Sequence, residues 1–383
     1  MAAAALAALA VGGCNIGDDS GGQPQIGAKS SDKSAASKLG FPASATRNTI
    51  RVGGGDAATD AAGVASAVFP ATAEGNRPTA VILVDKDSSQ DAVSASVLAS
   101  PPISAPILLA DGGSLPPVTK DTLERLKPKG SDLSKDAQVI RIGEGTARPS
   151  GFRTAVIAGE DPYERAAAID RFFSAARGKA SPNVLVVSGE KSEFALPGAA
   201  WAARGGDSVL PVKRDSVPDP IRKALRGHSK PNIYVLGPEA VIGRRAARQL
   251  ARLGRVHRIQ GPNPVQNAIA FARYKRGSFG WGASVPGYNF TLANTGRPLE
   301  AAAAASLASS GVYAPLLLTD SGERLPKQLD EYLRAVQPGY EDDPRDAVYN
   351  RVWVLGDDKA VSLGEQARVD QISELVPVQA NSP

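Results

Sequence analysis

The chain has 383 residues, with 44 Lys and Arg against 39 Asp and Glu and a net charge of +5. Its length predicts two or three domains, and a hydrophobic fraction of 42% provides a globular core, although only 5% of residues are aromatic. One Cys and two His exclude an intrachain disulfide and a zinc site built from Cys/His pairs, and the basic excess is milder than in typical nucleic-acid-binding domains.

The N-terminus predicts export and lipidation. Residues 1–13 read MAAAALAALAVGG, an apolar stretch too short to span a membrane, and Cys14 follows at once. This segment resembles a bacterial lipoprotein signal peptide, in which the Cys thiol carries diacylglycerol. Residues 14–45 are rich in Gly, Ser, Asp and Lys, and they predict a flexible tether behind the lipidated Cys. We therefore expect a body held outside the cytoplasmic membrane; the alternative is an apolar N-terminus with an unrelated Cys.

A unit of about 100 residues recurs three times along the rest of the chain. The clearest landmark is an apolar run, SAPILLAD at 104–111 and YAPLLLTD at 313–320. SVLPVKRD at 208–215 is the divergent middle copy. The predicted repeats are 46–150, 151–255 and 256–383.

Other landmarks recur in the same order. Each repeat opens with a strand, a Gly and a helix whose first turn an Asp or Asn can cap. A later helix begins near an acidic residue in two copies, and Phe194 replaces that residue in the middle copy. Each repeat closes on a β-rich run that ends in Gly. The aligned positions are Gly54, Gly159 and Gly261; Asp56, Asp161 and Asn263; and Asp91 and Glu300.

The strand pattern predicts the fold class. Short apolar runs without alternation are typical of strands buried on both faces of a parallel sheet. Each repeat therefore reads β-α-β-α-β-α-β, which predicts right-handed crossovers and a doubly wound sheet. We expect an α/β protein of three tandem small Rossmann-like domains, with the Ala-Pro run as a central core strand. The core residues of that run are Ile107, Leu108, Leu109, Leu316, Leu317 and Leu318.

These landmarks resemble the bacterial cell wall-binding repeat 2 family, in which three tandem copies are usual. The resemblance covers residues 50–375, and no copy is complete. Ala57 and Ala58 stand where the first copy should have Arg-Tyr, and Val156 stands where the second should have its opening Arg. The positions that match the family motif are Arg51, Gly54, Asp56, Gly159, Asp161, Tyr163, Arg258, Gly261 and, with Asn for Asp, Asn263.

The resemblance implies three domains around a pseudo-threefold axis that bind anionic cell-wall polymers, such as teichoic-type polysaccharides, noncovalently. Two alternatives remain open: a solute-binding lipoprotein of a transporter, and a degenerate repeat scaffold that binds another protein. We expect no enzyme, because the sequence has no Gly-x-Ser-x-Gly, His-Glu-x-x-His or convincing Ser-His-Asp pattern. We also expect no cofactor, no metal and no nucleic-acid partner.

Ligand contacts are expected at the carboxyl ends of strands, where open parallel sheets bind ligands. Arg residues suit phosphate or carboxylate because the guanidinium offers paired donors. The aromatic segment at 275–290 could stack on sugar rings, or it could pack against the body of the protein. The candidate ligand-binding residues are Arg51, Arg141, Arg244, Arg258, Arg297, Trp281 and Tyr288, with Lys213, Arg214 and Arg245 as further basic residues near strand ends and loops.

Overall fold

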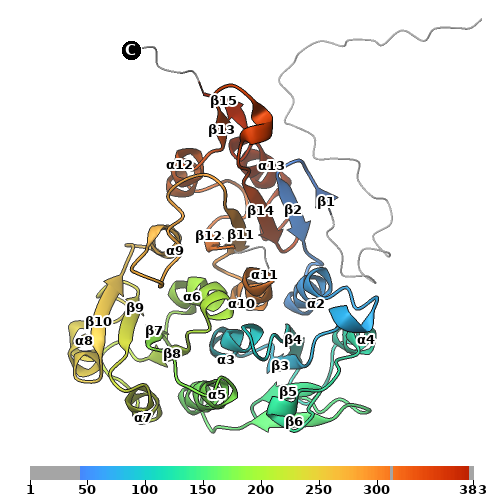
Figure 1. The fold of residues 1–383 in the computed structure, drawn as a ribbon, viewed down its shortest axis with the longest axis vertical. Helices are drawn as coiled ribbons and strands as arrows, with labels where there is room; N and C mark the ends of the chain where they lie inside the picture. The colour runs from blue at the N-terminus through green and yellow to red at the C-terminus, as the bar shows by residue number, and fades with distance from the viewer. Residues whose placement is uncertain (1–43, 311–313, 379–383) are drawn as a thin grey trace, which may run out of the picture.

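Three lobes around a common centre make up the part of the chain that the structure describes (Figure 1). This computed structural model describes residues 44–310 and 314–378. The predicted signal segment, Cys14 and nearly all of the predicted tether lie outside the described residues. Within the described residues, no helix is long and apolar enough to cross a membrane.

Each lobe is built on a parallel sheet with the same strand order, which confirms the predicted α/β class. The orders are β4-β3-β5-β6, β8-β7-β9-β10 and β12-β11-β14-β2, and the short β1 joins the third sheet antiparallel to β2. The strands are β1 (Ser44–Ala45), β2 (Thr49–Val52), β3 (Val81–Asp85), β4 (Ile107–Ala110), β5 (Val139–Ile142), β6 (Thr154–Ile157), β7 (Asn183–Ser188), β8 (Val209–Val212), β9 (Asn232–Leu236), β10 (Arg255–Ile259), β11 (Asn289–Asn294), β12 (Leu316–Thr319) and β14 (Arg351–Leu355).

Each sheet takes one strand from the repeat that follows it. β6 opens the second repeat but pairs with β5 of the first, and β10 opens the third repeat but pairs with β9 of the second. β2 opens the first repeat and pairs with β14 near the C-terminus, so the three repeats close into a ring (Figure 1, blue beside dark red). The repeat pattern had placed each opening strand within its own repeat. Periodicity fixes the length of a repeat but not the point at which a sheet begins.

The same helix of each repeat lies at the centre of the molecule (Figure 1). Ala and Ser dominate these helices, and small side chains let neighbouring helices approach closely. The centre is therefore an Ala-rich core, which accounts for the low aromatic content. The central helices are α3 (Ser89–Ala95) with the 3-10 turn η2 (Ser96–Ala99), α6 (Ser192–Gly205), and α10 (Pro298–Ala303) with α11 (Ala305–Ser309).

The remaining helices surround this centre. The opening helices of the repeats are α2 (Ala57–Val68), α5 (Pro162–Ala176) and α9 (Pro264–Arg273), and the Pro-led helices are α4 (Pro117–Leu126), α7 (Asp219–Gly227) and α12 (Lys327–Ala335). A further helix follows the closing strand of the second and third repeats, α8 (Arg244–Ala251) and α13 (Leu363–Ile372). The short elements are η1 (Glu74–Asn76), η3 (Asp132–Ser134), η4 (Pro344–Asp346) and the paired strands β13 (Gly339–Tyr340) and β15 (Val376–Pro377).

The predicted helix caps are confirmed in all three repeats. Asp56, Asp161 and Asn263 each accept a hydrogen bond from the backbone N–H three residues later, at 2.9, 2.8 and 2.8 Å. The preceding Gly allows the chain to turn tightly onto the helix. At Gly261, a Cβ atom would lie 2.3 Å from the Asn267 backbone nitrogen, so no other residue fits there without a shift.

The Ala-Pro runs form β4 and β12, and their apolar side chains are at most 2% exposed. Their expected position was wrong, because both strands end their sheets rather than running through the middle. They are nonetheless fully buried, since α2 covers β4 and α9 covers β12. The six Leu and Ile residues of the motif are therefore core, and none is placed to touch a polymer at the surface.

Successive repeats are joined through the same two aligned positions, but the type of contact differs from one junction to the next. Between the first and second repeats, Arg165 on α5 donates to Asp91 on α3 at 2.8 Å. Between the second and third, Asn267 on α9 donates to the Phe194 carbonyl on α6 at 3.4 Å. Asp91 and Phe194 occupy the same aligned position, which the family motif marks as acidic. In both copies this position contacts the next repeat.

The junction that closes the ring places two carboxyl groups together. Asp60 on α2 lies against Glu300 on α10, and the two side chains are 1% and 3% exposed. Burial raises the pKa of Asp60 to about 8, and the neighbouring Glu300 adds to the rise. Arg297 partly offsets the negative charge because it pairs with both Glu300 and Asp357. The closing junction therefore keeps a proton at neutral pH.

Candidate functional site

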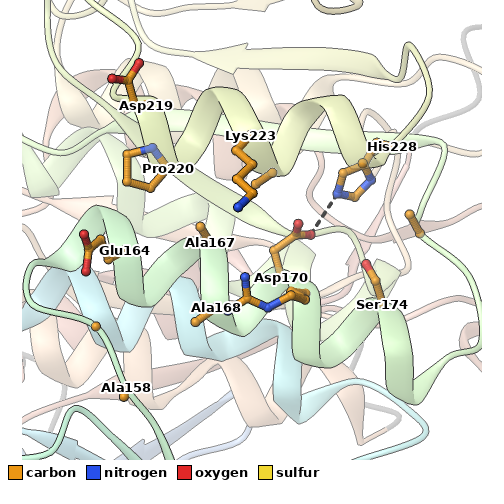
Figure 2. Close-up of a pocket in the computed structure, with 15 residues that line it drawn as sticks. Ala158, Glu164, Ala167, Ala168, Asp170, Ser174, Asp219, Pro220, Lys223 and His228 are labelled. Carbon is orange, nitrogen blue, oxygen red and sulfur yellow. Dashed lines mark hydrogen bonds and ion pairs between the residues drawn. The ribbon is translucent and has the colours of Figure 1, made fainter.

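A groove of about 700 Å³ runs between α5 and α7 on the outer face of the second sheet. Small residues such as Ala167, Ala168 and Ala224 leave the space open between the two helices. Charged side chains stand along it, with Lys223 directed from α7 towards α5 in Figure 2. Glu164 lies on the opposite wall. The groove is therefore a mainly apolar hollow edged by charged side chains.

A buried ion pair lies in one wall of this groove (Figure 2). Nε2 of His228, at the end of α7, lies 2.8 Å from Oδ1 of Asp170 on α5, and Nδ1 lies 2.8 Å from the Ser181 carbonyl. Carbonyl and carboxylate oxygens both accept, so the two bonds together favour a doubly protonated imidazole. Burial acts to lower the pKa of His228, but Asp170 outweighs it and the pKa is raised.

This pair joins the helices rather than serving a ligand. Both ring nitrogens of His228 are already engaged, so neither is free to take a proton from a bound molecule. The His228 side chain is 1% exposed and that of Asp170 is 6% exposed. The pair therefore fixes the width of the groove by tying the end of α7 to the middle of α5.

A second cavity, of about 890 Å³, opens at the carboxyl ends of the strands in the first sheet. Its place fits the expected ligand position of a parallel sheet, but its charge does not fit an anionic ligand. The cation that lines it, Arg165, is already bound to Asp91. Among the described residues, no group of three or more His, Cys, Asp or Glu is arranged to hold a metal ion. Its acidic residues are Asp85, Asp87, Asp91, Glu144, Glu160 and Glu164.

Three of the candidate Arg residues are committed to the fold. Arg51 is 3% exposed and donates to the carbonyls of Gly356, Asp357 and Val361. Its Nε also donates to Gln366 at 2.8 Å. These bonds occupy the guanidinium donors, so Arg51 is not available to an external polymer.

Arg258 and Arg141 make the same kind of contact in the other two sheets. Arg258 donates to the carbonyls of Gly237 and Ile242 at 2.6 and 2.9 Å. Arg141 donates to the Thr146 carbonyl at 2.7 Å. Each of these Arg residues holds the turn that follows the closing strand of a repeat, so we read all three as structural.

The other candidates divide by exposure. Arg297 is held by Glu300 and Asp357 at the ring-closing junction. Arg244 starts α8 with a side chain that is 78% exposed, and Glu239 pairs with it at 2.7 Å. Arg244 is therefore the most exposed of these candidate Arg residues, and it lies on the second repeat.

The aromatic candidates pack inside the protein. Trp281 is 8% exposed, and its ring centroid lies 5.3 Å from that of Trp201 on α6. Phe279 from the same segment stacks on Tyr234 of β9 with ring centroids 3.4 Å apart. The hydroxyl of Tyr288 lies within 3.5 Å of the Trp281 and Gly282 carbonyls. The segment at 275–290 thus attaches the third repeat to the second, which is the packing alternative rather than sugar stacking.

Sequence reasoning missed the groove and Lys223. Ala167 and Ala168 on one helix lie 56 and 55 residues before Lys223 on the other, and nothing in this spacing indicates that they face one another. Tyr163, a family-motif position, stands near the groove on α5 and packs half-buried beside Gly189 and under Lys213. The available signal was the run of cations around Lys223, which stands out only when charge is counted locally.

Comparison with known proteins finds a family model that matches this region. Residues 156–246 match the family model "Cell wall binding domain 2 (CWB2)", a stretch that contains the groove. The match confirms the resemblance for the middle repeat, and the equivalent sheets of the other two repeats are consistent with it. The comparison with curated proteins gave no match.

Two solved structures share the fold. Cwp8 from Clostridium difficile is 22% identical with a TM-score of 0.65, over 85% of this chain and 52% of that chain. Cwp6 from Clostridium difficile is 18% identical with a TM-score of 0.67, over 88% of this chain and 49% of that chain. This chain therefore spans about half the length of the two structures, and the likeness concerns the fold.

Proposed function

We propose that this protein binds anionic cell-wall polymer, a teichoic-type polysaccharide, noncovalently and without catalysis. The observation that carries the proposal is the match of residues 156–246 to a cell wall binding domain. The same strand order in all three sheets supports including the repeats outside the match in the proposal. Several weak contacts along a polymer that repeats the same unit would together give a long residence.

The N-terminus supplies the second half of the proposal. We infer that Cys14 carries lipid and that the segment before the folded body works as a tether, from the sequence of residues 1–45. The protein would then sit outside the cytoplasmic membrane with its body facing the wall. The three-lobed ring supports wall binding over a transporter's solute-binding lipoprotein, which closes two lobes around one cleft.

The proposal is tested by co-sedimentation of the full chain with purified cell wall. A Cys14→Ser substitution removes the predicted lipid, so that pelleting reports on the folded body alone. We expect the protein to pellet with intact wall and to stay in solution with wall stripped of teichoic-type polymer. Equal pelleting with both preparations would contradict the proposed ligand, because the polymer would then be irrelevant to binding.

A further inference from the structure

Positive charge is concentrated in one segment of the chain. Residues 213–258 contain twelve Lys and Arg against three Asp and Glu, a net of +9. The whole chain has a net charge of +5, so the remaining residues together have a net charge of −4. This segment belongs to the second repeat and runs from the end of β8 through α7, β9 and α8 to β10.

Helices α7 and α8 of this segment lie on the outer side of the second lobe, at the lower left of Figure 1. Helices α7 and α8 pack on one face of the second sheet through Ile221 and Leu225, and through Ala246 and Leu250. Their other sides are exposed to solvent. We use the term basic face for the exposed residues Lys223, Arg226, Arg245, Arg248, Arg252 and Arg255.

The basic face has no internal counter-charge among the described residues. The nearby acidic residues are taken, because Asp219 pairs with Arg222 at 2.6 Å and Glu239 pairs with Arg244 at 2.7 Å. No carboxylate of residues 44–310 or 314–378 forms an ion pair with a member of the basic face. The guanidinium groups are therefore free to bind an anion from outside.

Helix stability does not account for the Arg residues of α8. Arg244 and Arg245 occupy its first turn, where the helix dipole favours acidic residues, and that turn contains none. Arg248 lies four residues from both Arg244 and Arg252, and like charges at that spacing destabilise a helix. Residues that oppose local stability in this way are expected at functional sites.

The other repeats provide an internal comparison. Helices α4 and α12, the counterparts of α7, each carry two cations and two acidic residues. Helix α13, the counterpart of α8, carries Arg368 with Glu365 and Asp370, and residues 143–153 of the first repeat form no helix. The fold is therefore built twice without such a basic surface, so packing does not require it.

We infer that the basic face is the main contact for the anionic polymer, which rests on the proposed function. Arg245, Arg248 and Arg252 form a stripe along α8 that spans about 10 Å, at 1.5 Å per residue. Each guanidinium can take a phosphate or carboxylate in two parallel hydrogen bonds. On α7, Lys223 lies both on this face and in the groove, so the groove opens onto the basic face.

A polymer fits this face better than a lipid surface. Proteins that lie on membranes insert large apolar side chains beside their cations. The exposed large apolar residues of this chain include none between 213 and 258. The apolar sides of α7 and α8 are buried on their own sheet.

The test compares two variants of the full chain that lose the same charge. One carries Arg245→Gln, Arg248→Gln and Arg252→Gln, and the matched control carries Lys120→Gln, Arg148→Gln and Arg324→Gln at exposed sites in the other repeats. We expect the α8 variant to bind purified wall about tenfold more weakly, from three exposed charge contacts, and the control to stay within about twofold. The melting temperature should not fall in the α8 variant, because the removed charges repel one another.

Each outcome decides the inference. If the parent protein binds wall and the α8 variant binds equally well, the basic face is not the main polymer contact, while the proposed function still holds. Equal losses in both variants would also overturn it, since net charge rather than this surface would then govern binding. If the α8 variant lost only its binding to phosphatidylglycerol vesicles, the face would serve a lipid surface. If the parent protein does not pellet with wall, both the proposed function and this inference are wrong.

Discussion

At the scale of single residues, one Arg does the same task in each sheet but not from the same strand. Arg51 of β2 stands beside Val354 of β14, and Arg258 of β10 stands beside Val235 of β9. In the first sheet the pair is reversed, with Arg141 on β5 beside Val156 on β6. Position 156 lacks the motif Arg, but Arg141 on the neighbouring strand reaches the turn after β5 in its place.

This exchange predicts a rescue. Arg141→Val should lower the free energy of unfolding by about 2 kcal/mol, because the Thr146 carbonyl loses a charged hydrogen-bond donor. Adding Val156→Arg should recover most of that loss, since the new Arg takes the position that Arg258 has in the second sheet. Denaturant unfolding of the two single variants and the double variant measures both effects. A double variant no more stable than Arg141→Val would show that the two positions are not equivalent.

The closing junction predicts a pH dependence of stability. The pKa of Asp60 is raised from 3.8 to about 8, so the folded state holds a proton that the unfolded chain releases. The free energy of unfolding should therefore fall as pH rises through that interval. Asp60→Asn should flatten this fall and stabilise the protein at alkaline pH by on the order of 1–2 kcal/mol, because Asn can donate to Glu300 without a charge.

The aligned position in the third repeat provides the control. Asn267 accepts from the Gly261 backbone N–H and donates to the Phe194 carbonyl, which is the arrangement that Asp60→Asn would create. The reverse change, Asn267→Asp, should introduce a new loss of stability as pH rises. If chemical unfolding between about pH 4 and pH 8 showed the same slope with and without Asp60→Asn, Asp60 would not be the titrating group.

Residue roles were predictable where the partner is local. The caps by Asp56, Asp161 and Asn263 follow from the Gly and Pro around them, because a cap bonds three residues away. The role of Arg51 was not predictable, because its acceptor at Val361 is 310 residues away. A surface Arg and a buried structural Arg look the same in a sequence, and only the fold separates them.

At the scale of elements, ring closure depends on one short strand. β2 pairs with β14 through Val52 and Leu355, although nearly the whole chain lies between them. Asp370 on α13 secures the same segment by accepting from the Asn48 backbone N–H at 2.7 Å. The sequence indicated the strands and their number. It did not indicate that each opening strand pairs with the sheet of the preceding repeat, because that pairing depends on how the repeats are arranged in space.

Closure is tested by Val52→Asp. Val52 is fully buried, so an unpaired carboxylate there should cost about 3–5 kcal/mol and detach β2 from the third sheet. Hydrogen exchange should show faster exchange of the β14 amides than of those in β3 and β7. The control is Val285→Asp, where the side chain is 59% exposed and no such effect is expected. Full protection of β14 in the Val52 variant would contradict a closing role for β2.

At the scale of the whole molecule, charge rather than shape distinguishes the repeats. The three sheets share one strand order, yet the first presents an acidic cavity and the second presents the basic face. The sequence predicted the repeated α/β fold because apolar runs and Gly positions recur with the repeat. It did not predict the binding surface, because the net charge of +5 is the sum of a strongly basic segment and an acidic remainder.

The most direct measurement of the central claim is the affinity of the full chain for soluble purified wall polymer at a series of NaCl concentrations. Contacts between exposed Arg residues and an anionic polymer are screened by salt, so the dissociation constant should rise steeply between about 50 mM and about 500 mM NaCl. The variant with Arg245→Gln, Arg248→Gln and Arg252→Gln should start weaker and show a shallower dependence. An affinity that does not change with salt, or a slope that is the same in both proteins, would contradict polymer binding through the basic face.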